Sequence, residues 1–418
     1  MSKLKRLYLI TDGFPFGAGE KPFILPELPY LMEEYDVTII SPAPREVAAD
    51  KKFVTKLDER ITLIHIPPVP PMFDQNFVRA LSLHPVMREE AQIISEEALL
   101  VPQRLQDAFN NLLNAEIFFR QVMSTGAINL NEPCLVYTYW YNFRPLAFCL
   151  HREEFPNMKL ITRTHGYDLY NERKPLKRQP FRSFMNQKLD GIFFIAKQGL
   201  DYYRQTFTRN IDLAKLHYTP LGVKKISSSR RRIAMNKFQL VSCANVIPHK
   251  RVDLIAKALS LLNDNFNIHW THFGDGSDMP ELKTLASELL SNKTNITYWL
   301  MGHQNNGDVI RYYSFMDCSC FITTSATEGL PVSLQEALSF GMPIIGTDVG
   351  GISEEIDGNG ILLPSDPTPE EVARAITEIY NLNGEERLRR RMRSYEIWDE
   401  RFNIEKNARR FLDILRKL

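Results

Sequence analysis

The stretch of sequence that decides the fold is CFITTSATEGLPVSLQEALSFGMPIIGTDVGG, residues 320–351. It opens with an apolar run of strand length, and a loop around Glu328 leads into apolar residues at helical spacing. Pro331 suits the first turn of that helix, and Gly341 with Pro343 supplies its stop. The stretch therefore predicts a strand, a loop, a helix and a second strand, which is the order typical of a parallel α/β sheet.

The start of this predicted helix is an expected anion site. The first amides of a helix have no acceptor within the helix, and the helix dipole makes this end positive. Gly329 and Ser333 are small enough to let a phosphate approach these amides. Glu328 and Glu336 would repel a phosphate, so we expect them to accept hydrogen bonds from sugar hydroxyls. The alternative is that both glutamates are solvated surface groups.

The same alternation of strands and helices continues on both sides of this stretch. In the second half of the chain, apolar runs predict strands at 238–243, 268–273, 296–299 and 343–347, separated by helical patterns. In the first half, strands are predicted at 7–11, 37–41, 61–66, 134–139, 159–164 and 191–196. Residues 67–131 look helical and amphipathic, and we interpret them as an insertion over one face of the first sheet. The pattern predicts two doubly wound α/β domains.

A polar, charged segment without periodicity, residues 223–237, separates the two halves. We therefore place the first domain at 1–222 and the second at 238–397, with 223–237 as the linker. Residues 398–418 form a further helical segment at the end of the chain.

Composition excludes several classes of function. The chain has 418 residues, with 51 Lys and Arg against 50 Asp and Glu, so its net charge of +1 creates no field that would gather a nucleic acid. Five cysteines without C-x-x-C spacing argue against a disulfide framework or a zinc ribbon and indicate a reducing, cytoplasmic compartment. No apolar run reaches the ~18 residues of a spanning helix, so we expect any membrane contact at the surface of the bilayer.

The string EGLPVSLQE at 328–336, followed by ALSFGMPIIGTDVGG, resembles the signature of the family 4 glycosyltransferases, in which two glutamates flank seven residues that contain Gly and Pro. The resemblance implies the GT-B fold, with two Rossmann-like domains facing a central cleft and a last helix that crosses back to the N-terminal domain. It also implies a retaining transfer from a UDP- or GDP-sugar, without a metal or another cofactor. The first domain would hold the acceptor and the second the nucleotide sugar.

The string SCANVIPHKR, residues 242–251, resembles the segment in which family members hold the donor diphosphate with an Arg and, five residues later, a Lys. Lys250 matches that Lys, whereas Asn245 stands in place of the Arg and Arg251 in place of a usual Gly. Asn245 can supply a neutral donor, and Arg251 is either a substitute cation or a solvated helix residue. The residues expected to bind the donor are Gly17, Gly19, Asn245, Lys250, Arg251, Gly329, Leu330, Val332, Ser333 and Glu336.

By the same resemblance, the residues expected to act in catalysis are His165, Glu328 and Lys250. His165 lies in RTHGYDLY at the end of a predicted strand, where family members place a His beside the transferred sugar, and a core histidine is the alternative. Gly17 and Gly19 follow the first predicted strand, as in the glycine-rich loop of the family. Trp140 follows another strand, and it either stacks on a sugar or packs in the core.

Six basic residues without an intervening acid form one run: Arg173, Lys174, Lys177, Arg178, Arg182 and Lys188. Such a run is usually a solvated face. In a chain with a net charge of +1, it is also the best candidate for contact with anionic lipid headgroups or a pyrophosphate-linked acceptor.

These observations predict a retaining glycosyltransferase that moves a sugar from a nucleotide-diphosphate sugar to a saccharide acceptor, with a lipid-linked saccharide as the favoured one. The strings HGYDLY and SCANVIPHKR resemble members that assemble bacterial O-antigen, capsule or exopolysaccharide. The expected partners are a nucleotide sugar, the acceptor and an anionic membrane surface, without nucleic acid. We expect a cytoplasmic protein, with peripheral contact to the inner face of the membrane as an option. A nucleotide-sugar epimerase of the same architecture and a non-catalytic sugar-binding subunit remain as alternatives.

Overall fold

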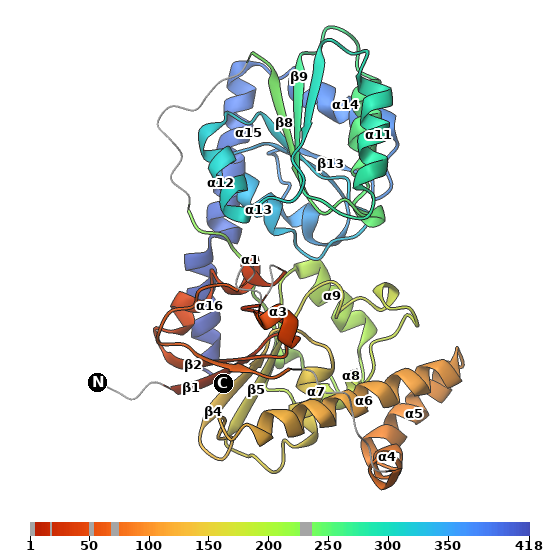
Figure 1. The fold of residues 1–418 in the computed structure, drawn as a ribbon, viewed down its shortest axis with the longest axis vertical. Helices are drawn as coiled ribbons and strands as arrows, with labels where there is room; N and C mark the ends of the chain where they lie inside the picture. The colour runs from red at the N-terminus through yellow and green to blue at the C-terminus, as the bar shows by residue number, and fades with distance from the viewer. Residues whose placement is uncertain (1–4, 17–18, 50–53, 68–74, 226–235) are drawn as a thin grey trace. The chain divides into compact units, whose positions relative to one another are not determined.

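The computed structural model describes residues 5–16, 19–49, 54–67, 75–225 and 236–418. It divides into two compact units. Unit 1 consists of Met1–Thr219 together with Ala408–Leu418, and unit 2 consists of Pro220–Asn407. Each unit contains one parallel sheet with helices packed against it (Figure 1). Residues 226–235, most of the expected linker, lie outside the described part of the chain.

The sheet of unit 1 has seven parallel strands in the order β3-β2-β1-β4-β5-β6-β7. The strands are β1 (Lys5–Ile10), β2 (Tyr35–Ser41), β3 (Thr62–His65), β4 (Cys134–Thr138), β5 (Met158–Thr164), β6 (Gly191–Phe194) and β7 (Leu216–Tyr218). All six strands predicted for this half are confirmed. The prediction missed β7, a short edge strand whose half-exposed residues give no alternation pattern.

Helices connect these strands, as parallel pairing requires. They are α1 (Lys21–Ile24), α2 (Leu28–Leu31), α3 (Arg45–Ala49), α4 (Gln75–Ser82), α5 (Pro85–Glu97), α6 (Val101–Ser124), α7 (Phe143–Leu150), α8 (Arg182–Lys188) and α9 (Lys197–Thr206), with short 3₁₀ turns at Asn171–Arg173 and Leu213–Lys215. Helices α4, α5 and α6 form the insertion expected within 67–131 (orange in Figure 1). Helix α6 buries Ala108, Leu112 and Ala115 in the core, at the three- and four-residue spacing of one helix face.

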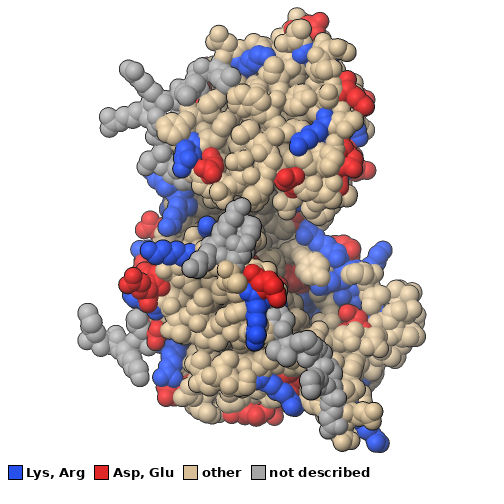
Figure 2. All heavy atoms as spheres, in the orientation of Figure 1, with Lys and Arg blue, Asp and Glu red and all other residues tan. Residues whose placement is uncertain are grey.

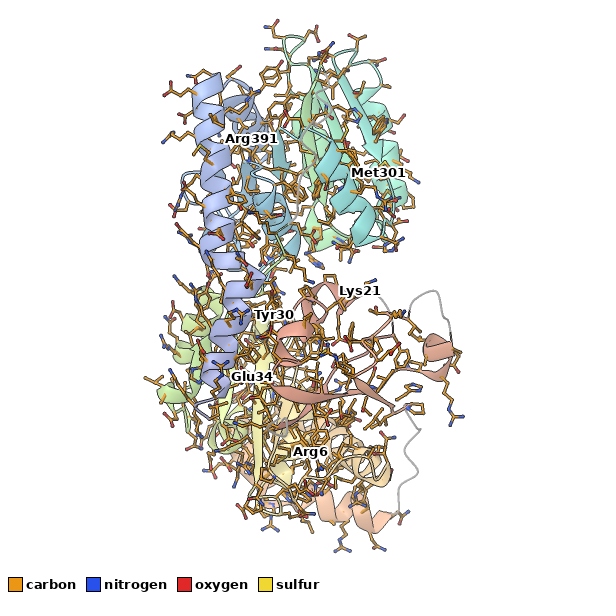
Figure 3. The ribbon with its side chains drawn as sticks, turned by 90° about the vertical axis from the view of Figure 1, so that its left-hand side faces the viewer. Arg6, Lys21, Tyr30, Glu34, Met301 and Arg391 are labelled. Atoms are coloured by element: carbon orange, nitrogen blue, oxygen red, sulfur yellow. The ribbon has the colours of Figure 1, made fainter. Side chains whose placement is uncertain are left out.

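The end of the chain belongs to unit 1. Phe411, Leu412 and Leu415 of α16 (Ile404–Leu415) are buried in the same apolar cluster as residues of β1, β2 and β4. Glu34, labelled in Figure 3 beside this helix, accepts a 3.1 Å bond from Nε of Arg416. The last helix therefore returns to the N-terminal sheet, as the family resemblance implied.

The sheet of unit 2 has six parallel strands in the order β10-β9-β8-β11-β12-β13. They are β8 (Phe238–Cys243), β9 (Ile268–Phe273), β10 (Ile296–Leu300), β11 (Cys320–Ile322), β12 (Ile344–Thr347) and β13 (Ile361–Leu363). The helices are α10 (Asp253–Ser260), α11 (Met279–Leu290), α12 (Asn306–Phe315), α13 (Val332–Ser339), α14 (Pro369–Tyr380) and α15 (Gly384–Ile397), followed by a π-helical turn at Trp398–Phe402. The second doubly wound domain is thus confirmed, and β13 is the strand that the prediction missed.

In each sheet the direction of strand connection reverses once. The reversal falls between β1 and β4 in unit 1 and between β8 and β11 in unit 2. Open α/β sheets bind ligands beyond the carboxyl ends of the strands at such a point, because the two loops there diverge and leave a crevice. The fold therefore marks two places at which functional side chains should gather.

Two properties of the chain bear on its surroundings. Among the described residues, no helix combines the length and the apolar character needed to span a bilayer. All five cysteines are free, and only Cys243 is not fully buried.

Candidate active site

Lys250 and Glu328 meet at the switch point of unit 2. Lys250 ends the 3₁₀ turn Pro248–Lys250 after β8, and Glu328 lies in the loop after β11. The Nζ atom of Lys250 lies 2.6 Å from Oε1 of Glu328, which also accepts a 2.7 Å bond from Oγ of Ser325. The side chains of Lys250 and Glu328 are 18% and 12% exposed, so the pair is partly shielded and still accessible to a ligand.

Arg251 holds the two loops together. It has a positive φ of 47°, and its side chain turns toward the β11 loop. Nε donates to the carbonyl of Thr324 at 2.8 Å and Nη2 to that of Ser325 at 2.9 Å, while Nη1 pairs with Asp366 at 2.6 Å. Arg251 is therefore neither a solvated helix residue nor a free cation. Its guanidinium fixes the position of the loop that carries Glu328.

Asn245 is exposed in the loop after β8, and close backbone packing shapes this loop. A Cβ at Gly274 would lie 1.8 Å from the carbonyl oxygen of Ala244, and one at Gly276 would lie 2.3 Å from that of Val246. Both positions require glycine, because any side chain would push the neighbouring loop away. Asn245 thus presents its amide from a loop of fixed shape, with no side-chain contact that would take up its donors among the described residues.

The start of α13 has the form expected of an anion site. Pro331 occupies the N-cap position, so the amides of Val332 and Ser333 are the first of the helix and have no intrahelical acceptor. Leu330 and Val332 are buried, and Gly329 and Ser333 are half-buried. The loop is held from behind, because the amide of Gly351 donates to the carbonyl of Gly329 at 2.6 Å.

Glu336 is the buried acid of this site. It lies on the second turn of α13, is 6% exposed, and accepts a 2.6 Å hydrogen bond from Nδ2 of Asn306 at the start of α12. Burial raises the pKa of Glu336 to about 7, and the bond from Asn306 offsets only part of this effect. A buried carboxylate at neutral pH favours a ligand that donates hydrogen bonds to it, as a ribose hydroxyl does.

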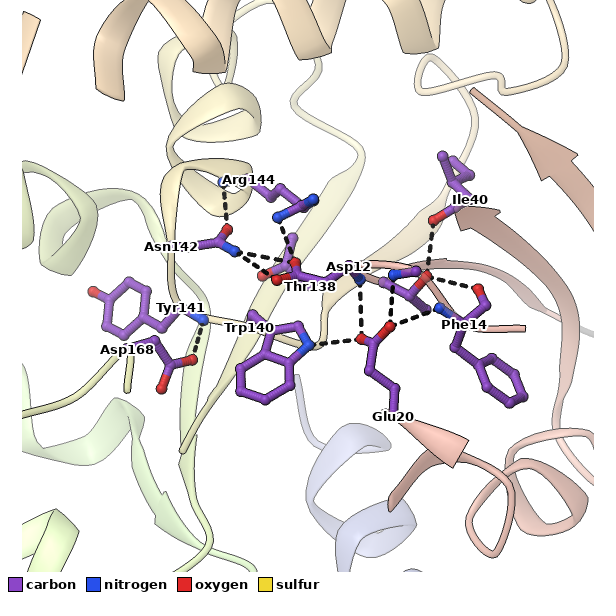
Figure 4. Close-up of polar contacts among 12 residues, drawn as sticks. Asp12, Phe14, Glu20, Ile40, Thr138, Trp140, Tyr141, Asn142, Arg144 and Asp168 are labelled. Atoms are coloured by element: carbon purple, nitrogen blue, oxygen red, sulfur yellow. Dashed lines mark hydrogen bonds and ion pairs between the residues drawn. The ribbon is translucent and has the colours of Figure 1, made fainter. Parts of the chain in front are cut away.

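In unit 1, Glu20 organises the loop after β1. Its carboxylate accepts hydrogen bonds from the amides of Asp12 at 2.9 Å and of Gly13 and Phe14 at 2.6 Å each. It also accepts a 2.6 Å bond from Nε1 of Trp140, which follows β4 (Figure 4). One buried carboxylate therefore joins the ends of β1 and β4 at the switch point of this sheet.

His165 lies beside this group, at the end of β5. It is buried, its amide donates to Oδ1 of Asp168 at 2.6 Å, and its ring packs 4.2 Å from the Trp140 ring, between centroids. Neither ring nitrogen has a hydrogen-bond partner among the described residues, because Nδ1 stays 3.7 Å from Oδ2 of Asp168. The structure thus brings His165 and Trp140 together and leaves the imidazole with unused polar atoms.

Asp12 completes the polar group at this edge. Its carboxylate forms an ion pair with Arg144 and accepts a 3.1 Å bond from Nδ2 of Asn142 (Figure 4). Burial raises the pKa of Asp12, whereas the nearby Arg144 lowers it.

The glycine-rich loop is described only in part. Gly17 lies outside the described residues, and Gly19 precedes α1 with nothing within 4 Å of the place that a Cβ would occupy. The structure therefore shows no close approach that would require glycine at position 19. The amides that precede this loop, at positions 12–14, donate to the Glu20 carboxylate.

Comparison with known proteins finds a family that part of the chain resembles. Residues 223–397 match the sequence model described as Glycosyl transferases group 1. This part of the chain, 175 of 418 residues, resembles a glycosyltransferase group 1 domain. The site built from Lys250, Glu328, α13 and Glu336 lies inside the matched range.

Relatives of the group 1 domain include bacterial and archaeal glycosyltransferases. The O-antigen biosynthesis glycosyltransferase WbnH of Escherichia coli is 30% identical over 132 residues, which are 32% of this chain and 34% of that protein. The GtfA subunit of a UDP-N-acetylglucosamine–peptide N-acetylglucosaminyltransferase from Streptococcus agalactiae is 25% identical over 221 residues, 51% of this chain and 42% of the relative. The matched part thus spans less than half the length of either relative.

Solved structures resemble the whole chain. HepE of Anabaena, solved in complex with UDP, aligns with a TM-score of 0.64 and 13% identity over 99% of this chain and 100% of its own. The lipopolysaccharide outer core galactosyltransferase WaaB aligns with a TM-score of 0.62 and 15% identity, over 99% and 100%. At such identities the likeness concerns the fold alone, which is GT-B.

The run of basic residues is not the continuous surface that we expected. Arg178 and Arg182 are buried, so their assignment to a membrane-facing strip is wrong. Arg178 pairs with Glu90 and, at 3.0 Å, with Glu97 of α5, which lie about eighty positions earlier in the chain and outside the basic window. On the face seen in Figure 2, Lys and Arg (blue) are interspersed with Asp and Glu (red).

The other members of the run differ in environment. Arg173 lies 5.4 Å from the Tyr170 ring centroid, and Nζ of Lys174 lies 3.6 Å from that of Tyr167. Lys188 pairs with Glu153 at 2.7 Å, whereas Lys177 is exposed. Only Lys177 fits the solvated strip that the sequence suggested.

Sequence reasoning missed a set of polar residues in unit 1: Asp12, Glu20, Asn142, Arg144 and Asp168. A signal was available for three of them. Asp12, Asn142 and Asp168 each follow the end of a neighbouring strand within four residues. Because these strands are parallel, their ends meet at one edge of the sheet. Glu20 gave no such signal, since its role depends on a loop that folds back.

Proposed function

We propose that this chain is a retaining glycosyltransferase of family 4 that moves a sugar from a UDP- or GDP-sugar to a saccharide acceptor. The observation that carries the proposal is the convergence of Lys250, Glu328 and the start of α13 at the switch point of a group 1 domain. The names of the relatives WbnH and WaaB support a role in bacterial O-antigen or other surface-polysaccharide synthesis, with a lipid-linked acceptor. Capsule synthesis belongs to the same proposal.

Each donor group has a partner in this proposal. The diphosphate lies between the Lys250 ammonium and the amides of Val332 and Ser333, which supply positive potential without a metal. The ribose hydroxyls donate to the Glu336 carboxylate. Asn245 adds a neutral donor from its exposed loop.

Stabilisation of the leaving group drives the reaction. As the bond between the sugar and the diphosphate breaks, negative charge grows on the departing phosphate oxygen, which the ammonium and the amides already face. The acceptor hydroxyl attacks from the same side, forms the new glycosidic bond and passes its proton to that phosphate oxygen. Retention then needs no carboxylate pair of the kind that retaining hydrolases use. We assign Glu328 and, in unit 1, His165 to sugar binding.

A cytoplasmic location with peripheral membrane contact is also part of the proposal. Lys177 is the exposed cation of the basic run that supports such contact. Because exposed charges act over about 8 Å at physiological salt, the contact would be salt-sensitive.

The experiment is a transfer assay with a panel of UDP- and GDP-sugars and lipid-linked saccharides. We expect one donor to support transfer, the product to keep the anomeric configuration of the donor by NMR, and activity to survive EDTA. Inversion at the anomeric carbon would overturn the retaining mechanism. Activity that is lost with EDTA and restored by Mg²⁺ or Mn²⁺ would overturn the metal-free diphosphate site.

A further inference from the structure

Unit 1 contains a pocket of 570 Å³ at its switch point. Its lining includes Asp12 after β1, Asn142 after β4, Asp107 of α6 and residues of the segment from Tyr167 to Arg182. Ligand pockets in proteins measure roughly 300–1,000 Å³, so this one can hold a sugar residue with a substituent. The donor site of the proposed function lies in unit 2 and does not use this pocket.

Arg182 lines the pocket as a buried charge without an acidic partner. It is 5% exposed, and Nη2 donates to the carbonyl oxygens of Tyr141, at 2.7 Å, and of Asp168. Its Nε has no acceptor, and no carboxylate among the described residues lies within ion-pair distance of the guanidinium. A buried charge is costly unless an opposite charge compensates it. The surroundings of Arg182 supply neutral oxygens and the Tyr141 ring, whose centroid lies 3.5 Å from Cζ, but no opposite charge, so an electrostatic requirement remains that an anion would meet.

The other charged groups of the pocket do not meet this requirement. Arg144 takes up the charge of Asp12, and Arg178 is neutralised by glutamates of α5. Asp107 is the remaining acid of the lining, and burial raises its pKa, whereas Lys174 and Arg178 lower it. Asp107 forms no ion pair with Arg182 among the described residues, so no acid of the pocket lining compensates the charge of Arg182.

The pocket also offers groups that suit a sugar ring. Tyr167 is 58% exposed, and Nζ of Lys174 lies 3.6 Å from its ring centroid, so an aromatic face and a cation stand together at the wall. Asn142 and Asp12 provide amide and carboxylate groups for hydroxyls (Figure 4).

We propose that this pocket binds an acceptor saccharide that carries an anionic group, a phosphate or a carboxylate, with Arg182 and Lys174 as its counter-charges. That this ligand is the acceptor of the transfer rests on the proposed function. The pocket adds that the acceptor is an acidic sugar. The planar guanidinium of Arg182 suits two oxygens of one anion, and the ammonium of Lys174 adds a point charge.

The test is calorimetry without nucleotide, using glucose 1-phosphate, glucuronate and glucose as probes. We expect at least one anionic probe to bind the intact chain about tenfold more tightly than glucose, and the better of the two to identify the anion as phosphate or carboxylate. Lys174→Ala should weaken that binding about tenfold, whereas Lys177→Ala, in the same loop but exposed, should leave it unchanged. Arg182→Gln should abolish it.

Arg182→Gln removes a donor to two carbonyls and can unfold the loop, so Lys174→Ala with its Lys177→Ala control decides the outcome. Equal binding of all three probes, no binding of any, or equal affinity in the two lysine variants would overturn the pocket assignment. A UDP titration of the same preparation separates the two claims. If the chain binds UDP but fails these tests, the proposed function stands and the acidic acceptor is wrong. If it binds the anionic sugars but no nucleotide, the pocket assignment stands and the proposed function is wrong.

Discussion

Lys250 and Glu328, 78 positions apart in the chain, form an ion pair with 2.6 Å between Nζ and Oε1 at the carboxyl ends of two adjacent strands. In the ligand-free chain, Glu328 therefore neutralises the cation that we assign to the donor diphosphate. A diphosphate must compete with this carboxylate for Lys250, and once it binds, Glu328 becomes available to a sugar hydroxyl. The pair links occupation of the phosphate site to the freedom of the sugar-binding acid.

The first prediction separates the roles of these two residues. Glu328→Gln removes the negative partner of Lys250, so UDP should bind as tightly as to the original chain or up to about tenfold more tightly. Sugar transfer should fall by about 100-fold, because the sugar loses a charged acceptor. Calorimetry with UDP and the transfer assay measure the two effects, with the exposed Glu281→Gln as control. A parallel loss of UDP affinity and transfer would contradict the separate roles.

The second prediction follows from the pKa of about 7 that burial gives Glu336, against an ordinary value of 4.5. Between these two values the folded chain holds a proton that the unfolded chain has lost, so stability falls as pH rises from 4.5 to 7. The loss amounts to about 3 kcal/mol at most. Thermal unfolding of Glu336→Gln, which cannot ionise, should show a flatter pH dependence than the original chain over this window. Identical profiles would mean that Glu336 is already ionised at low pH.

The third prediction concerns Glu20. The Glu20 carboxylate accepts four hydrogen bonds, and in Glu20→Gln an NH₂ group replaces one of its two oxygens. This NH₂ group would face N–H donors, so some backbone amides of the loop after β1 lose their acceptor. We expect a loss of about 2 kcal/mol in the free energy of unfolding, measured with urea. The exposed Glu59→Gln serves as the matched control. If both variants unfold at the same urea concentration, the bonds to Glu20 do not stabilise the loop.

The fourth prediction distinguishes a structural arginine from a surface lysine. Arg178→Gln leaves Glu90 buried without its partner and should lower the free energy of unfolding by about 3 kcal/mol. Lys177→Gln, one residue earlier, should change it by less than about 0.5 kcal/mol. If the two variants have the same free energy of unfolding, the ion pairs of Arg178 do not stabilise the fold.

The fold was predictable because both sheets are built from regular units. Apolar runs of strand length alternate with helical patterns, and the Pro331 and Gly341 signals bound α13 to within one residue. The two missed strands, β7 and β13, have three residues each and lie at the edges of their sheets, where half-exposed sequence gives little pattern.

The site was predictable where it coincides with a contiguous motif and not where distant loops meet. Glu328, Ser333 and Glu336 lie in one string, so their proximity follows from a single loop and helix. The bonds of Arg251 to the β11 loop and of Arg178 to α5 join segments that are far apart in the chain. A run of basic letters cannot reveal such partners, because a cation and its carboxylate meet only through tertiary packing.

The central claim is that Lys250 holds the donor diphosphate, and calorimetry on Lys250→Met tests it most directly. The original chain is first titrated with UDP- and GDP-sugars to find the donor that binds. Lys250→Met should bind that donor about 10- to 100-fold more weakly, through loss of charge-assisted hydrogen bonds worth about 1–3 kcal/mol. Lys257→Met, which removes a half-exposed lysine of α10 paired with Asp253, should bind it unchanged. Equal donor affinity in Lys250→Met and Lys257→Met would contradict the account.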